Sequence, residues 1–511
     1  MSSILFTNVF VIDGSGQPGA YGEVLVNNGI IRQISYLRTG IGCRAADTVI
    51  DGQELCLSPG FIDAHGHSDI SLLAAPDAFG KISQGITTEL AGNCGLSPFP
   101  ITDLNREHLE QLWRSYNEKL TWHDYQGYKT ELLRRNPAIN LYVQCGHNTL
   151  RAAVAGYETK QLNAVQLNQM KQLLLSNLQQ GASGFSTGLL YTPGIFAPDA
   201  EIVELLKVLA PFLRVYSTHL RSEGDRLLES VSEAINACKS SGQRYLHLSH
   251  LKTAKTANHG KLADLLQLIT ANQSDFLHIT ADRYPYVESL TQLSVALPAP
   301  YDELDDISLM NKLQNPAYRH DLIQALKNQN QERLNSIRLV STSAARYRRF
   351  SGIKLVDIAN ELHSLVPELL TDILSLDAPG AMAAFCGMSS ENMRQIIMQK
   401  YVSCGTDESS RPADYSLGVS HPRGFGSMPR FINLLKQNDF TLEQAIAKIT
   451  SLPAAIFNLT NRGRLQADMM ADLVLFNPDK LRAMADFTSP HTPADGIEQV
   501  YVNGKLRYKR G

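Results

Sequence analysis

Two histidines at alternate positions, His65 and His67, follow a short apolar run in the stretch PGFIDAHGHSD. Alternate residues of a strand point to the same side, so two imidazoles at this spacing can reach one ion together. An HxH pair by itself is also compatible with a turn or with hydrogen-bonded core histidines. The stretch therefore predicts a metal site only if further ligands come from elsewhere in the chain.

Four further reactive side chains follow other predicted strands, in GNCGLS, STHLRSEGD, LSHLK and CGTDE: Cys94, His219, His250 and Asp407. Imidazole nitrogens and a thiolate favour Zn²⁺, and a catalytic zinc keeps one position open for water. We predict that Cys94, His219 and His250 form such a zinc site. The two histidines of the first strand would add a second metal position that shares the Cys94 sulfur.

Each of these residues also has a structural interpretation. Cys94 alone is compatible with a packed thiol, and Asp407 with a turn or helix-cap aspartate. His247, three residues before His250, is assigned to packing on the opposite face of its strand. Surface or hydrogen-bonded positions are expected for four more histidines: His108, His123, His320 and His491.

The segments that carry these residues have the pattern of repeated βα units. Short apolar segments alternate with longer amphipathic ones, which is typical of a parallel sheet. The candidate strands are residues 61–63, 86–90, 140–145, 184–186, 213–218, 245–249, 277–282 and 398–404. Eight such units predict an α/β fold with a closed (β/α)₈ TIM-like barrel over residues 58–460. A long helical insertion, at about 287–399, is expected before the last strand and over the barrel mouth.

Both ends of the chain read as β-structure. Residues 1–57 and 461–511 contain strands of alternating polarity, with hairpin turns predicted at Asn28-Gly29 and Asn503-Gly504. We expect the two ends to form one small β-sandwich domain together.

Composition limits the class of protein. The 511 residues are 43% hydrophobic and 19% charged with a net charge of -3, which is typical of a globular protein and gives no reason to expect a nucleic-acid partner. No apolar run is long enough to span a bilayer, and the start MSSILFTNVFVIDGSG lacks the pattern of a signal peptide, so we expect a cytoplasmic protein with no membrane partner. The odd number of cysteines, seven, is scattered, so most are expected to be reduced and buried.

The chain closely resembles the D-aminoacylases, the N-acyl-D-amino-acid deacylases of the amidohydrolase superfamily. The resemblance rests on PGFIDAHGH, KISQGITTELAGNCG, GHNTLRAAVAGYE, GASGFSTGLLYTPG, STHLRSEGD, LSHLK, DRYPY, SHPRGFGSMPR and ADLVLFNPDK, and runs from the first strands to the last hairpin. It implies tight zinc ligands at Cys94, His219 and His250, and a weaker second metal position at the two first-strand histidines. It also implies a catalytic aspartate at Asp407.

The same resemblance implies a small-molecule N-acyl-D-amino acid as substrate, held by Tyr191, Lys252, Tyr284 and Arg423. Asp407 would take a proton from the attacking water and deliver it to the departing amine. Arg423 offers a bidentate fork for the substrate carboxylate, and Lys252 a second charge. Tyr191 or a first-strand histidine would be the donor to the oxyanion. The preference for the D hand follows from the resemblance alone.

Two residues depart from the family pattern: Glu408 replaces the usual glycine after the aspartate, and His259 replaces the usual tryptophan before GK. Arg283 is expected to point outward from its strand. A cyclic amidohydrolase such as a hydantoinase or dihydroorotase is an alternative, although GASGFSTGLLY lacks the metal-bridging lysine of those enzymes. A metal-free scaffold protein is a second alternative. The sequence leaves open the side-chain and acyl preferences, one or two working metals, and the oligomeric state.

Overall fold

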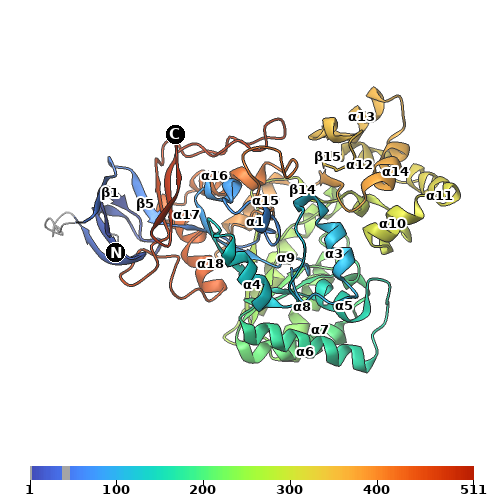
Figure 1. The fold of residues 1–511 in the computed structure, drawn as a ribbon, viewed down its shortest axis with the longest axis horizontal. Coiled ribbons are helices and arrows are strands. Elements are labelled where there is room, and N and C mark those ends of the chain that lie inside the picture. The colour runs from blue at the N-terminus through green and yellow to red at the C-terminus, as the bar shows by residue number, and fades with distance from the viewer. Residues whose placement is uncertain (1–2, 37–45) are drawn as a thin grey trace.

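The computed structural model describes residues 3–36 and 46–511, and shows a mixed α/β protein (Figure 1). Cys43, one of the seven cysteines, lies outside these residues. The other six are all free thiols. Within the described part of the chain, no helix is long and apolar enough to cross a membrane.

Strands from both ends of the chain share one eight-stranded sheet, at the left of Figure 1. β5 pairs with β19 in antiparallel fashion and so joins the two ends. Both Asn-Gly turns are confirmed as two-residue hairpin turns with positive φ at Asn28, Gly29, Asn503 and Gly504. The strands of this sheet are β1 Ser3–Val11, β2 Ala20–Asn27, β3 Ile30–Tyr36, β4 Thr48–Asp51, β5 Cys56–Pro59, β19 Leu473–Phe476, β20 Ile497–Val502 and β21 Lys505–Lys509.

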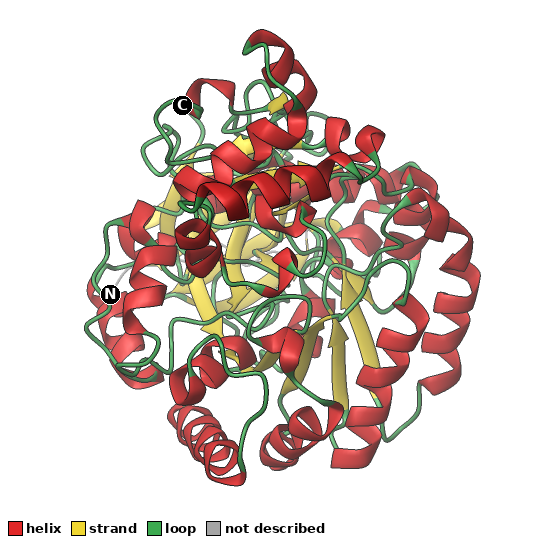
Figure 2. Ribbon diagram, turned by 90° about the vertical axis from the view of Figure 1, so that its right-hand side faces the viewer, coloured by secondary structure: helices red, strands yellow, loops and turns green. Residues whose placement is uncertain are grey.

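Parallel strands form the centre of the molecule, with helices around them (Figure 2). A three-stranded sheet has the order β6-β7-β8, and a six-stranded sheet the order β18-β13-β12-β11-β10-β9. Only Gln144 separates β8 from β9, so one chain segment belongs to both sheets. The strands are β6 Phe61–Asp63, β7 Ile86–Ala91, β8 Asn140–Val143, β9 Cys145–Gly146, β10 Gly184–Gly188, β11 Val215–His219, β12 Tyr245–Leu248, β13 His278–Asp282 and β18 Val402–Ser403.

Main-chain hydrogen bonds also connect the ends of the first and last of these strands. The Ala64 N–H donates to the Cys404 carbonyl at 3.1 Å, and the Asp407 N–H donates to the His65 carbonyl at 2.7 Å. The last predicted strand was too long at its start, because Ser389 caps the helix α15 Ser390–Met398 and this helix takes up the first of those residues.

Local capping residues define the ends of two of the surrounding helices. Asn163 and Gln166 form a capping box before α6, and Gly181 ends it at φ 117°; Gly242 ends α8 at φ 76°. The helices outside the insertion are α1 Ser71–Ala74, α2 Phe79–Ile82, α3 Arg106–Leu112, α4 Tyr125–Arg134, α5 His147–Ala155, α6 Ala164–Gln180, α7 Asp199–Leu209, α8 Leu227–Ser241, α9 Leu262–Asn272, α15, α16 Arg423–Lys436, α17 Leu442–Lys448 and α18 Ser451–Ile456.

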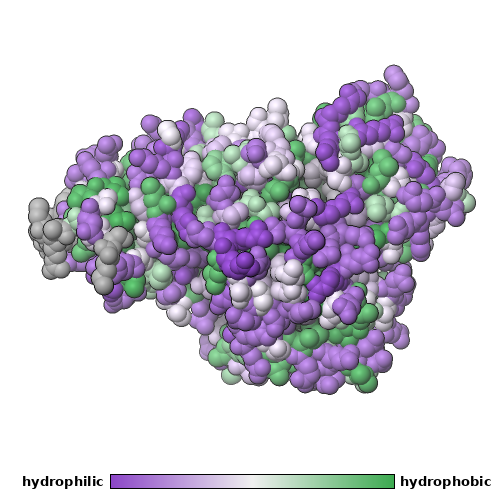
Figure 3. Space-filling model, in the orientation of Figure 1, coloured by the Kyte–Doolittle hydropathy of each residue, from purple (hydrophilic) through white to green (hydrophobic). Residues whose placement is uncertain are grey.

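The segment between β13 and α15 contains a lobe with its own hydrophobic cluster, at the upper right of Figure 1. It was predicted as helical, but it also contains a four-stranded sheet in the order β14-β17-β15-β16. On the face drawn in Figure 3, hydrophilic residues cover most of this lobe. Its elements are β14 Ser289–Gln292, α10 Asp306–Lys312, α11 Pro316–Lys327, α12 Gln331–Ser336, β15 Arg338–Ser341, β16 Ile353–Lys354, α13 Leu355–Glu361, α14 Val366–Asp377 and β17 Met382–Phe385.

Candidate metal centre

Three reactive residues that come two to four positions after parallel strands adopt left-handed backbone conformations. Cys94 follows β7 with φ 52°, His250 follows β12 with φ 36°, and Asp407 follows β18 with φ 51°. Non-glycine residues rarely adopt positive φ, and such strain persists only where the surrounding structure holds it. The surrounding structure therefore holds these three residues in strained backbone conformations, and their side chains lie close together.

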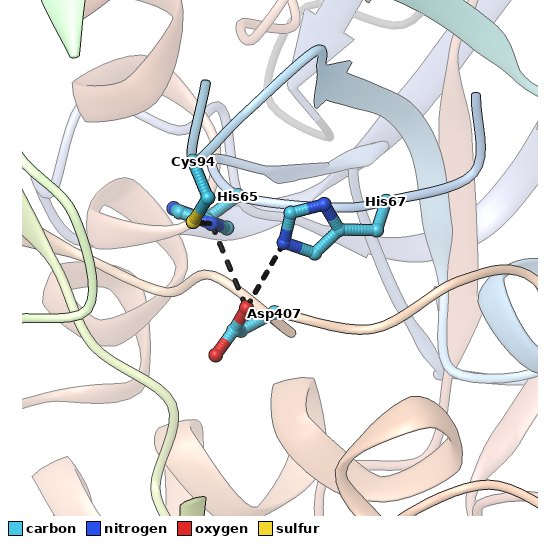
Figure 4. Close-up of side chains that lie close together, drawn as sticks. All are labelled: His65, His67, Cys94 and Asp407. Carbon is cyan, nitrogen blue, oxygen red and sulfur yellow. Dashed lines mark hydrogen bonds and ion pairs between the residues drawn. The ribbon is translucent and has the colours of Figure 1, made fainter. Parts of the chain in front are cut away.

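All six predicted metal and acid residues converge there. The donor atoms of one group lie within 4.8 Å of one another, and so do those of a second group that shares Cys94. Figure 4 shows the first group. The groups are His65, His67, Cys94 and Asp407, and Cys94, His219 and His250.

The donor set fits a zinc ion. The Cys94 Sγ lies 3.4 Å from the Nε2 atoms of both His65 and His250. Both ring nitrogens of His219 are buried and have no hydrogen-bond partner among the described residues. A buried imidazole without a partner is costly, and a metal ion would satisfy it.

Charge at the centre favours the anionic forms of the thiol and the acid. Burial alone raises the pKa of the Cys94 thiol, but the neighbouring His65 and His250 hold it well below its usual value. Burial likewise opposes ionisation of Asp407, yet Arg423 and then His250 hold the pKa of its carboxyl well below the usual range. A thiolate ligand and a carboxylate base are therefore both available at neutral pH.

Asp407 faces the two first-strand histidines. Its Oδ1 lies 3.1 Å from the His67 Nε2 and 3.6 Å from the His65 Nε2, as the dashed lines in Figure 4 mark. Its Oδ2 lies 2.9 Å from Arg423 Nη1, and the Arg423 guanidinium also donates to the Asp407 carbonyl. One carboxylate oxygen thus faces the metal groups while the other is paired with a cation.

Asp282, at the end of β13, organises several of these groups and was missed by the sequence reasoning. Its Oδ2 lies 3.1 Å from the His65 Nδ1 and 3.0 Å from the His247 Nε2, and its Oδ1 accepts the His250 N–H at 3.1 Å. The assignment of His247 to packing alone was wrong, because this imidazole contacts the same carboxylate as His65. Asp282 stands at the end of a predicted strand, in DRYPY, and this position could have indicated its role from the sequence.

Lys81 is a second missed residue. Its fully buried ammonium donates to Asp63 Oδ2 at 2.7 Å, to Thr406 Oγ1 at 2.7 Å and to the Glu408 carbonyl at 2.8 Å. Asp63 precedes the HxH pair and Thr406 precedes Asp407. Lys81 therefore ties the segment that carries the first two histidines to the segment that carries the acid. Nothing in its local sequence pattern indicates this role.

The predicted substrate residues lie around the same cavity, which has a volume of about 1220 Å³ and is also lined by residues of the lobe. The buried Tyr284 hydroxyl has no hydrogen-bond partner among the described residues. Its ring centroid lies 4.6 Å from the Arg423 guanidinium and 6.0 Å from Lys252 Nζ. The Tyr191 hydroxyl lies 3.1 Å from Thr291 Oγ1 on β14, and its ring lies 4.8 Å from the His219 ring.

Arg283 does not point outward as expected, since it is only 1% exposed. Its guanidinium stacks on the Tyr284 ring at 4.0 Å and donates to the Tyr286 carbonyl at 2.8 Å. The structure also shows the contacts of the two residues that depart from the family pattern. Glu408 lines the cavity and accepts the His421 N–H at 3.2 Å, and the His259 Nε2 lies 3.0 Å from the Gly387 carbonyl.

Comparison with known proteins agrees with this geometry. Residues 48–328 and 428–508 match the profile of the amidohydrolase family. The chain belongs to that family. Amidohydrolases similar to it include the N-acyl-D-glutamate deacylase of Alcaligenes xylosoxydans xylosoxydans, at 31% identity over 97% of this chain and 91% of that protein. The D-aminoacylase of the same organism is 30% identical over 98% of this chain and 93% of that protein.

A solved amidohydrolase structure is similar along almost the whole chain. The crystal structure of N-acyl-D-glutamate deacylase from Bordetella bronchiseptica, complexed with zinc and a phosphonate inhibitor, has a TM-score of 0.82 and 29% identity. The match covers 99% of this amidohydrolase and 96% of that one. The expected family and the mixed α/β fold are therefore confirmed.

Proposed function

We propose that this chain hydrolyses the amide bond of N-acyl-D-amino acids, giving a carboxylate and a free D-amino acid. The observation that carries the proposal is the convergence of a thiolate, imidazoles and one aspartate on a single cavity. Relatives that are about 30% identical over almost the whole chain carry the names of such deacylases, which supports the same reaction here.

We propose zinc as the metal, with Cys94, His219 and His250 as the tight ligands. His65 and His67 would hold a weaker second ion beside it. The donor types and the unpartnered His219 ring support this assignment. When bound, zinc lowers the pKa of a water molecule towards about 7 and polarises the acyl oxygen.

Asp407 is proposed as general base and then general acid. Its Oδ1 faces the metal groups, so it can accept a proton from the attacking water and deliver it to the departing amine nitrogen. The lowered pKa of its carboxyl keeps Asp407 deprotonated at neutral pH, which is the form that a general base needs. Arg423 fixes the other oxygen, which limits rotation of the carboxylate.

The free carboxylate of the substrate is proposed to bind at Tyr284, Lys252 and Arg423. The Tyr284 hydroxyl is a donor that lacks a partner among the described residues, and the Tyr284 ring lies near both Arg423 and Lys252. Tyr191 is proposed as a donor to the acyl oxygen, because its ring contacts the His219 ring. These contacts and the zinc site would hold the substrate at two points, its carboxylate and its acyl oxygen. A pocket for the side chain would supply the third point, which is the minimum for choosing one hand.

We further propose that the parallel strands close into a (β/α)₈ barrel over residues 58–460, with an insertion at about 287–399. The hydrogen bonds from Ala64 to Cys404 and from Asp407 to His65 support closure. Residues 1–57 and 461–511 are proposed to form one small β-sandwich domain, supported by a hydrophobic cluster with members from both ends. A cytoplasmic location without a nucleic-acid partner remains part of this proposal.

A hydrolysis panel of N-acetyl D- and L-amino acids, with metal content measured on the same sample, tests the function. We expect turnover of D substrates by protein that holds about one tight zinc. The panel includes acidic and apolar side chains, as well as a hydantoin and dihydroorotate. Turnover of the rings alone would favour the cyclic amidohydrolase, and a protein that takes up no zinc would favour the scaffold.

A further inference from the structure

The Glu223 carboxylate, four residues after His219, contacts the metal centre from outside. Its Oε1 lies 2.8 Å from the His250 Nδ1 and accepts a hydrogen bond from Lys252 Nζ. Its Oε2 lies 3.8 Å from the His219 Nε2. One carboxylate therefore reaches two proposed zinc ligands and one proposed substrate residue. The sequence reasoning gave it no role.

Two groups with opposite requirements compete for the His250 Nδ1. The Lys252 Nζ lies 2.8 Å from this nitrogen, in hydrogen-bonding geometry, and the Glu223 Oε1 lies at the same distance. A neutral imidazole has one N–H and one lone pair. A carboxylate needs the proton on Nδ1, whereas an ammonium needs the lone pair there.

The outcome decides whether the other ring nitrogen can bind a metal. The His250 Nε2 faces the Cys94 Sγ at 3.4 Å, and it can ligate only with its lone pair free. That form has its proton on Nδ1, the form that Glu223 favours. If Lys252 alone contacted Nδ1, the proton would lie on Nε2 and would block the ligand position.

We infer that Glu223 is a positioning residue that sets the tautomer of His250 against the competing contact from Lys252, and thereby makes His250 a metal ligand. The inference rests on the metal site proposed above. Asp282 contacts the Nδ1 of His65 in the same way, at 3.1 Å. The feature particular to His250 is the ammonium that faces the same nitrogen.

Zinc affinity of three variants tests the inference: Glu223→Leu, Lys252→Met and the double variant. Each purified full-length protein is stripped and dialysed against zinc buffered with a chelator. Loss of an outer partner typically costs 10–100-fold in metal affinity, so we expect a loss of about this size in Glu223→Leu. Because the competitor is then absent, the double variant should regain most of the affinity. Lys252→Met alone should bind zinc at least as tightly as the unchanged protein.

Glu201→Leu is the matched control. Glu201 pairs with His147 and Arg151, so it has the same kinds of partner, but neither is a candidate ligand. Its zinc affinity should be unchanged. If Glu223→Leu does not fold, Glu223→Ala replaces it in both the single and the double variant, with the same expected gain from Lys252→Met.

Two results would overturn the inference: unchanged zinc affinity in the Glu223 variant, or a double variant that binds as weakly as the single one. The second result would mean that the carboxylate acts through its charge or packing and not through the tautomer. An unchanged protein that takes up no zinc would instead refute the metal site itself, so the two failures are distinguishable.

Discussion

Two buried clusters in this molecule have the same chemical composition, a carboxylate, an imidazole and a cation, but differ in how their hydrogen bonds are satisfied. In the first, Glu201 contacts the His147 Nε2 at 2.7 Å and the Arg151 Nε at 3.1 Å. The Nη1 and Nη2 atoms of Arg151 donate to the carbonyls of Thr159 and Lys160. This cluster ties α5, the following turn and α7 together, and its contacts are mutually compatible.

The second cluster, Glu223, His250 and Lys252, contains a conflict. Two partners face one ring nitrogen, and the other ring nitrogen faces a sulfur. In the proposed metal-bound form the proton lies on Nδ1, where it satisfies Glu223, and Lys252 keeps its hydrogen bond to the same carboxylate. The two clusters are both buried and have the same kinds of charge, so what distinguishes the proposed functional cluster is the competition for one ring nitrogen.

The largest expected effect comes from removing Cys94, the proposed zinc ligand that faces the Nε2 of His250. Cys94→Ala should lose tightly held zinc, with a fall in affinity greater than the roughly 100-fold that an outer partner costs. Metal analysis of the purified variant, beside the unchanged protein, checks this. A full equivalent of zinc retained by Cys94→Ala would refute the site.

Asp407→Asn should separate metal binding from turnover. Removing a general acid-base typically costs about 10²–10⁴-fold, so turnover should fall by this factor while zinc content stays the same. Asparagine has almost the same shape as aspartate, and its carbonyl oxygen can accept the hydrogen bond that Arg423 now makes to Asp407. Turnover near the unchanged rate would exclude Asp407 as the base.

Glu201→Leu should lower the stability of the protein without changing its zinc affinity. Leaving His147 and Arg151 without the carboxylate removes one partner of a buried pair, which costs about 3–5 kcal/mol in the free energy of unfolding. Urea unfolding of the metal-free protein measures this. A stability equal to that of the unchanged protein would show that the two clusters do not differ as we describe.

Lys448 is a third buried cation that can be compared with these two clusters. Its Nζ donates to the Gln399 carbonyl at 2.5 Å. Burial lowers its pKa to about 7. The unfolded chain, with a lysine pKa of about 10.4, then binds more protons than the folded one, so the free energy of unfolding rises with pH between about 7 and 10.4.

Lys448→Met should remove this contribution, which is at most about 1.4 kcal/mol per pH unit. Urea unfolding of both proteins at several pH values checks the sign. The same slope in both would contradict the lowered pKa.

The sequence predicted candidate site residues best where they follow parallel strands. Cys94 and Asp407 were predicted together because parallel strands present their carboxyl ends at one edge, and the structure brings them into one group. Glu223 and Lys81 were missed because they act through other residues, and their partners are defined only by the folded chain. The lobe sheet was missed because its strands are short and separated by helices.

The main-chain bond from the Asp407 N–H to the His65 carbonyl has a further consequence. The acid is anchored through its backbone to the residue whose imidazole faces it, so their separation does not depend on any side chain of the lobe. Displacement of the lobe would change entry to the cavity while leaving the spacing of acid and imidazole intact. We therefore expect that substitutions in the loops of the lobe would alter the lining of the cavity without altering the spacing of Asp407 and His65.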